Sequence, residues 1–76
     1  MPALFITKKN GAYVVHKQAS EDQNIHGDLV INAYDIFFFT LGREYTERGI
    51  KSFLRNNEDE IILDESAQDI SDHVRT

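Results

Sequence analysis

The residues best able to carry out chemistry in this sequence are the carboxylates of its last third. Seven acidic side chains lie between residues 58 and 72, and Arg75 is the one basic residue after position 55. Residues 56–76 therefore have a formal charge of −6, whereas residues 1–55 have +1 and the whole chain has −5. This distribution disfavours binding to nucleic acid or to anionic membranes and favours a basic partner protein. We expect the contacts to come from Glu58, Asp59, Glu60, Asp64 and Glu65.

Catalytic and metal chemistry find weaker support in the sequence. His16, His26 and His73 lack the spacing that presets a zinc site, and the acidic stretch 56–60 lacks the glycine and distal glutamate of an EF-hand loop. The chain has no cysteine, which removes thiolate catalysis and cysteine-ligated zinc. Paired carboxylates would need a cleft, for which 76 residues leave little volume. We expect a non-enzyme without metal or cofactor.

A ridge of basic residues supports an alternative function. Arg43, Arg48, Lys51 and Arg55 would lie near one another on a helix over residues 43–55. If residues 33–41 were also helical, the two helices and a following strand would form a winged helix-turn-helix that binds phosphates directly. Glu44 and Glu47 lie on or beside this ridge, however, and no base-reading Asn or Gln stands in the first turn.

The elements that position these residues are arranged around an apolar run at residues 36–41. Its sequence, IFFFTL, has high β propensity and no charge, which favours a strand buried on both faces. A helix is the competing interpretation, with Asn32 as N-cap and Gly42 just beyond the end. Tyr34, Phe37, Phe38 and Leu41 would then share one face. Periodicity alone cannot separate the strand from the helix. We prefer the strand because of the high β propensity of the run and its lack of charge.

An N-terminal hairpin is the clearest local prediction. Asn10-Gly11 separates two apolar stretches, residues 3–9 and 12–17, and both turn residues tolerate positive φ. The resulting register pairs Phe5 with His16 and Ile6 with Val15. One face then has Leu4, Ile6, Tyr13 and Val15, and the other has Phe5, Thr7, Val14 and His16.

The rest of the chain reads as a polar loop over 18–28, a short strand at 29–31, a helix over 43–56, a short strand at 60–63 and a last helix. The first helix presents Ile50, Phe53 and Leu54 on one side. The last helix is expected to begin at Ser66 as N-cap and to present Ala67, Ile70 and Val74. Together these elements predict one α+β domain over residues 1–76: an N-terminal β-hairpin in a small antiparallel sheet, one amphipathic helix packed on it, and a short acidic C-terminal helix.

These observations favour a non-catalytic binding module. The chain has no apolar run of membrane-spanning length and no recognisable secretion signal, so we expect a soluble cytoplasmic protein. In size and charge it is similar to the class of small acidic inhibitors encoded by phages and other mobile elements, which imitate the charge of a nucleic acid. This similarity implies an inhibitor or modulator that binds a basic surface of another protein. A solubilising role for the acids and a homodimer formed through the Phe run or a hairpin edge remain alternatives.

Overall fold

The computed structural model describes residues 3–18, 30–33 and 36–74, and it begins with the predicted hairpin. Strands β1 (Ala3–Lys9) and β2 (Ala12–Gln18) are joined by Asn10 and Gly11, whose φ angles of 53° and 81° are both positive. This is the turn geometry whose twist matches that of paired strands. The predicted register is confirmed, because Phe5 pairs with His16 and Ile6 with Val15.

The apolar run is a strand, as preferred, and the helical alternative is wrong. Strand β4 (Ile36–Tyr45) pairs antiparallel with both β3 (Val30–Ala33) and β2. It continues through Gly42 to Tyr45, so residues 43–45 belong to the strand and not to the predicted helix. Between the pairs Val14↔Glu44 and His16↔Thr40, three residues of β4 lie opposite one residue of β2. A glycine inside a strand commonly marks such an irregularity rather than a strand end.

Helix α1 (Glu47–Asn56) follows β4 and begins four residues later than predicted. Thr46 is the N-cap, and its Oγ1 accepts a hydrogen bond from the Gly49 N–H at 3.1 Å. This bond satisfies one of the free donors of the first turn. Ile50 and Leu54 are buried as predicted, and burying each stabilises the fold by about 1.5 to 3 kcal/mol.

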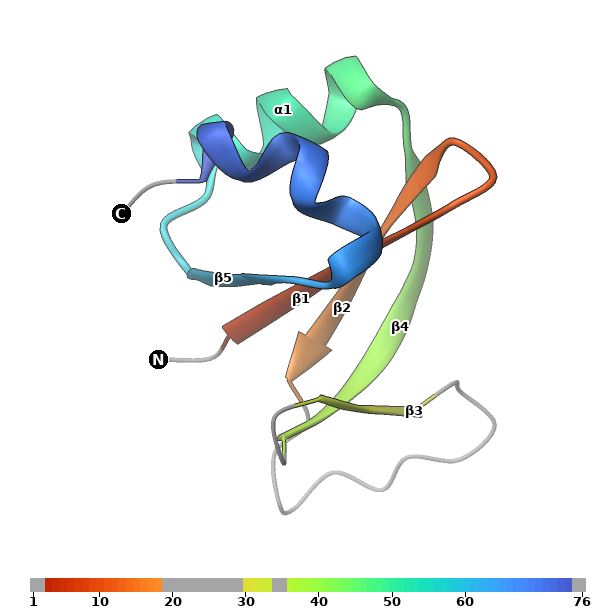
Figure 1. Cartoon of the computed structure of the whole chain (residues 1–76). Coiled ribbons are helices and arrows are strands. Elements are labelled where there is room, and N and C mark those ends of the chain that lie inside the picture. Colours follow the sequence, from red (N-terminus) through yellow and green to blue (C-terminus); the bar gives the residue numbers. More distant parts are fainter. Residues whose placement is uncertain (1–2, 19–29, 34–35, 75–76) are drawn as a thin grey trace.

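The sheet is mixed rather than entirely antiparallel. Strand β5 (Glu60–Leu63) pairs parallel with β1, giving the strand order β3-β4-β2-β1-β5. Strands β4 and β5 are parallel to each other and α1 connects them across one face of the sheet, as Figure 1 shows. A helical crossover of this kind returns the chain in the same direction, which a hairpin cannot do. The sequence shows the helix but not which strand β5 joins.

The last element, η1 (Glu65–His73), is a 3-10 helix, and Asp64 rather than Ser66 is its N-cap. Its apolar side was predicted correctly: Ala67 and Ile70 are buried, and Val74 packs beside them. Figure 1 shows η1 beside α1 on the same side of the sheet.

Two apolar clusters lie on opposite faces of the sheet. The larger is between the sheet and the two helices, where Leu4, Ile6, Tyr13 and Val15 meet apolar residues of α1, β5 and η1. The smaller joins Ala3, Phe5 and Phe38, with Ile62 packed against them. The predicted division of the hairpin into two apolar faces is thus confirmed.

Candidate functional site

The five acids predicted to contact a partner lie at the two ends of β5. Glu58 and Asp59 precede the strand and Glu60 begins it, whereas Asp64 and Glu65 follow it. At about 3.3 Å per residue, the backbone positions of Glu60 and Asp64 are about 13 Å apart. The structure therefore places the five acids in two groups along one edge of the sheet.

Asp64 has a structural role. Its Oδ2 accepts hydrogen bonds from the Ser66 hydroxyl at 2.6 Å and from the Ser66 backbone N–H at 3.1 Å. These bonds, led by the one from the hydroxyl, hold the pKa of the Asp64 carboxyl below its ordinary value of 3.8. Because its acceptor is occupied in starting η1, Asp64 is less suited to a partner contact than the sequence suggested.

A second structural acid, Asp69, was not among the predicted contacts. Its Oδ2 accepts hydrogen bonds from the Tyr13 hydroxyl at 2.5 Å and from Lys8 Nζ at 2.9 Å. The Tyr13 bond and then the Lys8 bond lower the pKa of Asp69, and the bond to Asp69 raises that of Lys8. Burial, followed by the bond to Asp69, raises the pKa of Tyr13. Lys8 and Tyr13 are opposite each other in the predicted hairpin, but nothing in the sequence places Asp69 beside them.

Glu58, Glu60 and Glu65 are different, and we call them the surface acids. Their side chains are exposed, and within the described residues none of them forms an ion pair or a side-chain hydrogen bond. Asp59 is intermediate, since it is half-buried in the turn before β5 and its backbone N–H donates to Asn57 Oδ1 at 2.8 Å. Apart from the position of Glu65 in the first turn of η1, where a negative charge is favourable, the described part of the fold gives the surface acids no partner.

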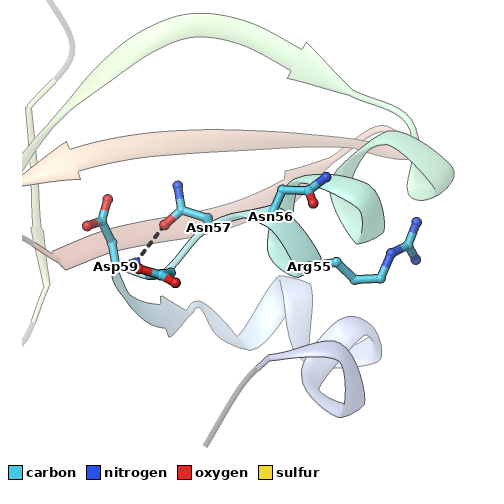
Figure 2. A pocket seen from close by; sticks show the side chains of 5 residues that line it. Arg55, Asn56, Asn57 and Asp59 are labelled. Carbon is cyan, nitrogen blue, oxygen red and sulfur yellow. Dashed lines mark hydrogen bonds between the residues drawn. The ribbon is translucent and has the colours of Figure 1, made fainter.

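An open hollow of about 450 Å³ lies where α1 ends, and it is lined by Arg55, Asn56, Asn57, Glu58 and Asp59. Figure 2 shows Arg55 and Asp59 at opposite ends of this group, with the Arg55 side chain directed away from Asp59. The C-terminal end of a helix has a partial negative charge, which adds to that of the two carboxylates. Arg55 in the same lining offsets part of this negative charge, so the hollow has mixed charge.

The basic ridge does not form as predicted. Arg43 lies on β4, where its guanidinium is 4.9 Å from the centre of the Tyr45 ring, so it is not on the same element as Arg48, Lys51 and Arg55. Lys51 faces Glu47 at 3.5 Å. Because residues 36–45 form a strand, the helix-turn-helix that the nucleic-acid alternative required is absent from this part of the chain.

A second open hollow, of about 460 Å³, lies between β4 and α1. The half-buried rings of Tyr45 and Phe53 are 5.3 Å apart in its wall, and Arg43 and Asn56 also line it. Its lining mixes one cation with aromatic and amide groups. No group in it points to a particular ligand.

The histidines do not come together in the described structure. His16 is buried, and its Nε2 lies 2.9 Å from Thr7 Oγ1, whereas His73 is exposed and His26 lies outside the described residues, as does most of the predicted polar loop. Burial lowers the pKa of His16, so the native state resists protonation and the fold loses stability as the pH falls below 6.5. Across residues 3–18, 30–33 and 36–74, no three His, Asp or Glu side chains are grouped to hold a metal ion.

Neither α1 nor η1, the helices of the described chain, has the length and apolar content needed to cross a bilayer. Comparison with known proteins found no matching family model, no similar curated protein and no similar solved structure. The class of the protein therefore rests on its fold, a small α+β domain with an acidic edge.

Proposed function

We propose that this domain is a non-catalytic protein-binding module that presents its surface acids to a basic surface of a partner protein in the cytoplasm. The observation that carries the proposal is the contrast within one segment. Asp64 and Asp69 are bonded inside the fold, whereas Glu58, Glu60 and Glu65 are exposed and unpaired among the described residues. Carboxylates that the fold does not use are available to a partner.

The geometry supports a partner with two separated basic groups. Glu58 and Glu60 lie at one end of β5 and Glu65 lies beyond the other, so the two basic groups of the partner would be separated by at least the length of β5, about 13 Å. Electrostatic complementarity of this kind speeds association and selects the partner. A basic groove that otherwise binds nucleic acid fits this description, and the proposal includes an inhibitor that occupies such a groove.

The test is capture of partner proteins from a nuclease-treated lysate of the source cells. The Glu58→Lys/Glu60→Lys variant is compared with the control Glu44→Lys/Glu47→Lys, which changes the net charge equally but on β4 and α1. Each reversal adds two charges, so both variants have a formal net charge of −1. We expect the first variant to lose the partner and the control to keep it.

Two further readouts complete the experiment. Thermal unfolding checks that both variants remain folded, and a DNA duplex added to the captured complex should displace the domain if the partner surface binds nucleic acid. Retention of the partner by the folded Glu58→Lys/Glu60→Lys variant would contradict the proposed function. Equal loss in both variants would show that only net charge matters, which is what a solubilising surface predicts.

A further inference from the structure

Strand β5 leaves one side of the sheet open. It is the last strand in the order β3-β4-β2-β1-β5, so β1 pairs with one side of it and no described strand pairs with the other. An unpaired strand edge presents backbone N–H and C=O groups that can add a further strand.

The direction of these groups follows from one hydrogen bond. The backbone N–H of Asp64 donates to the Ile6 carbonyl of β1 at 2.9 Å, so this N–H is directed toward β1. Because successive residues of a strand alternate, the N–H and C=O of Ile62 are also directed toward β1, and those of Ile61 and Leu63 are directed outward. Two residues of β5 therefore offer main-chain groups at the open edge.

The edge already binds an amide from its own chain. Gln68 Nε2 donates to the Leu63 carbonyl at 3.1 Å and to the Asp64 carbonyl at 3.3 Å. Gln68 is exposed, so its side chain can be displaced. It occupies the position that a backbone N–H of an added strand would take on Leu63. The Ile61 and Leu63 N–H groups have no acceptor among the described residues beyond the sheet ladder.

Apolar surface and charge define the added strand. Ile61 and Ile62 are half-buried and lie on opposite faces of β5, so each keeps exposed apolar surface beside the edge. Glu58 and Glu60 stand at one end of the strand and Glu65 beyond the other. A complementary segment has an apolar centre of about four residues with Lys or Arg at both ends. Since both ends of β5 are acidic, charge does not select the direction of the added strand.

We infer that the open edge of β5 binds an extended basic segment of the partner protein by strand addition, with its main chain on Ile61 and Leu63 and its basic side chains on the surface acids. This inference rests on the proposed function and specifies the partner as a flexible chain rather than a folded basic groove. Main-chain hydrogen bonds supply affinity in this mode, and the flanking charges supply selectivity.

The test uses a capped synthetic peptide with two lysines at each end of an alternating threonine–valine centre. Its controls are a peptide with glutamates in place of the lysines and one with prolines in the centre, which cannot form a ladder. Hydrogen exchange of the protein amides is followed by NMR. We expect exchange to slow about tenfold or more at Ile61 and Leu63 with the lysine peptide alone. The amides of Ile62 and Asp64 face β1 and serve as internal controls.

A pair of variants separates strand addition from charge. Ile61→Pro removes an outward N–H without removing a bond to β1, since proline is tolerated on the open side of edge strands. Ile61→Ala is its matched control, because it also loses side-chain packing but keeps the N–H. We expect Ile61→Pro to bind the lysine peptide about tenfold more weakly than Ile61→Ala. If Ile61→Pro does not fold, the amide exchange pattern of the unmodified protein with the lysine peptide is the test of strand addition.

Several outcomes would overturn the inference. The first two are equal binding of the lysine peptide by the folded Ile61→Pro and Ile61→Ala variants, and no saturable binding of this peptide at all. The third is slower amide exchange at residues other than Ile61 and Leu63. The fourth is a dimer, detected by sedimentation, that occupies the edge and excludes the peptide. If Ile61→Pro still captures the natural partner while Glu58→Lys/Glu60→Lys does not, strand addition fails and the proposed function stands. If the charge variant also keeps the partner, the proposed function fails as well.

Discussion

Five of the seven acids of the C-terminal segment divide into two sets that the sequence does not distinguish. Asp64 and Asp69 accept hydrogen bonds that begin η1 and attach it to the hairpin, whereas the surface acids Glu58, Glu60 and Glu65 extend into solvent. All five contribute equally to net charge. An acidic segment therefore cannot be read as one binding surface, because part of its charge holds the fold together.

The largest effect is expected from removing the apolar anchor that brings the structural acids into place. Ile70 is fully buried between η1 and the sheet, and Ile70→Ala should lower the free energy of unfolding by about 2 to 5 kcal/mol. Urea unfolding measures this loss. Asp72→Ala, on the exposed side of the same helix, is the control and should change stability by less than about 0.5 kcal/mol. Similar losses for Ile70→Ala and Asp72→Ala would mean that the buried side of η1 does not stabilise the fold.

Loss of the Asp64 cap is expected to have the next largest effect. Asp64→Ala should cost about 0.5 to 2 kcal/mol at neutral pH, because the first N–H groups of η1 lose their acceptor. Since the folded pKa of Asp64 is lowered, its contribution is present above pH 3.8 and is lost as the pH falls through the folded pKa. Unfolding curves across that range test this. Asp64→Asn keeps an acceptor and should retain most of the stability, and an equal loss would contradict a capping role.

Tyr13→Phe should have a smaller effect that reports on Asp69. It keeps the buried ring and removes the hydroxyl, so we expect a loss of about 0.5 to 1.5 kcal/mol. The pKa of Asp69, measured by NMR, should rise toward 3.8, and the wild-type advantage should diminish as the pH falls through the lowered folded pKa. Tyr45→Phe is a control on a half-buried tyrosine without a described hydroxyl bond. An unchanged Asp69 pKa in Tyr13→Phe would show that the Tyr13 hydroxyl does not lower it.

The smallest effect is expected from the surface acids themselves. Glu60→Gln and Glu65→Gln should each change the free energy of unfolding by less than about 0.5 kcal/mol, because neither carboxylate is bonded among the described residues. Thermal unfolding at low salt would detect a small gain from reduced repulsion between acids. A loss near that of Asp64→Ala would erase the distinction between the two sets.

The parts of the fold that could be predicted from the sequence are those marked by local patterns. The Asn10-Gly11 turn fixed the hairpin and both of its faces, and the spacing of Ala67 and Ile70 identified the buried side of the last helix. Helix starts were less accurate. Thr46 is followed three residues later by Gly49 rather than the Glu or Gln of a capping box, so the cap was not recognised.

The non-local features could not be predicted in the same way. The parallel pairing of β5 with β1 depends on where α1 returns the chain, and the bond from Tyr13 to Asp69 joins residues 56 positions apart. Neither leaves a spacing that one sequence can reveal. The structure places the five predicted acids at the two ends of β5 and gives Asp64 a capping role that Glu60 does not have. Their contact with a partner stays a prediction.

The parallel pairing of β1 with β5 also has a consequence for how the chain reaches its native state. One edge of β1 has no strand beside it until residues 60–63 are available, and the larger apolar cluster lacks Ala67 and Ile70 until η1 has been synthesised. Contacts between distant residues are formed late, because closing a long loop costs entropy before the contact compensates for it. A nascent chain ending before residue 60 would expose Leu4 and Ile6, and it is in this interval that aggregation or chaperone binding would compete with folding.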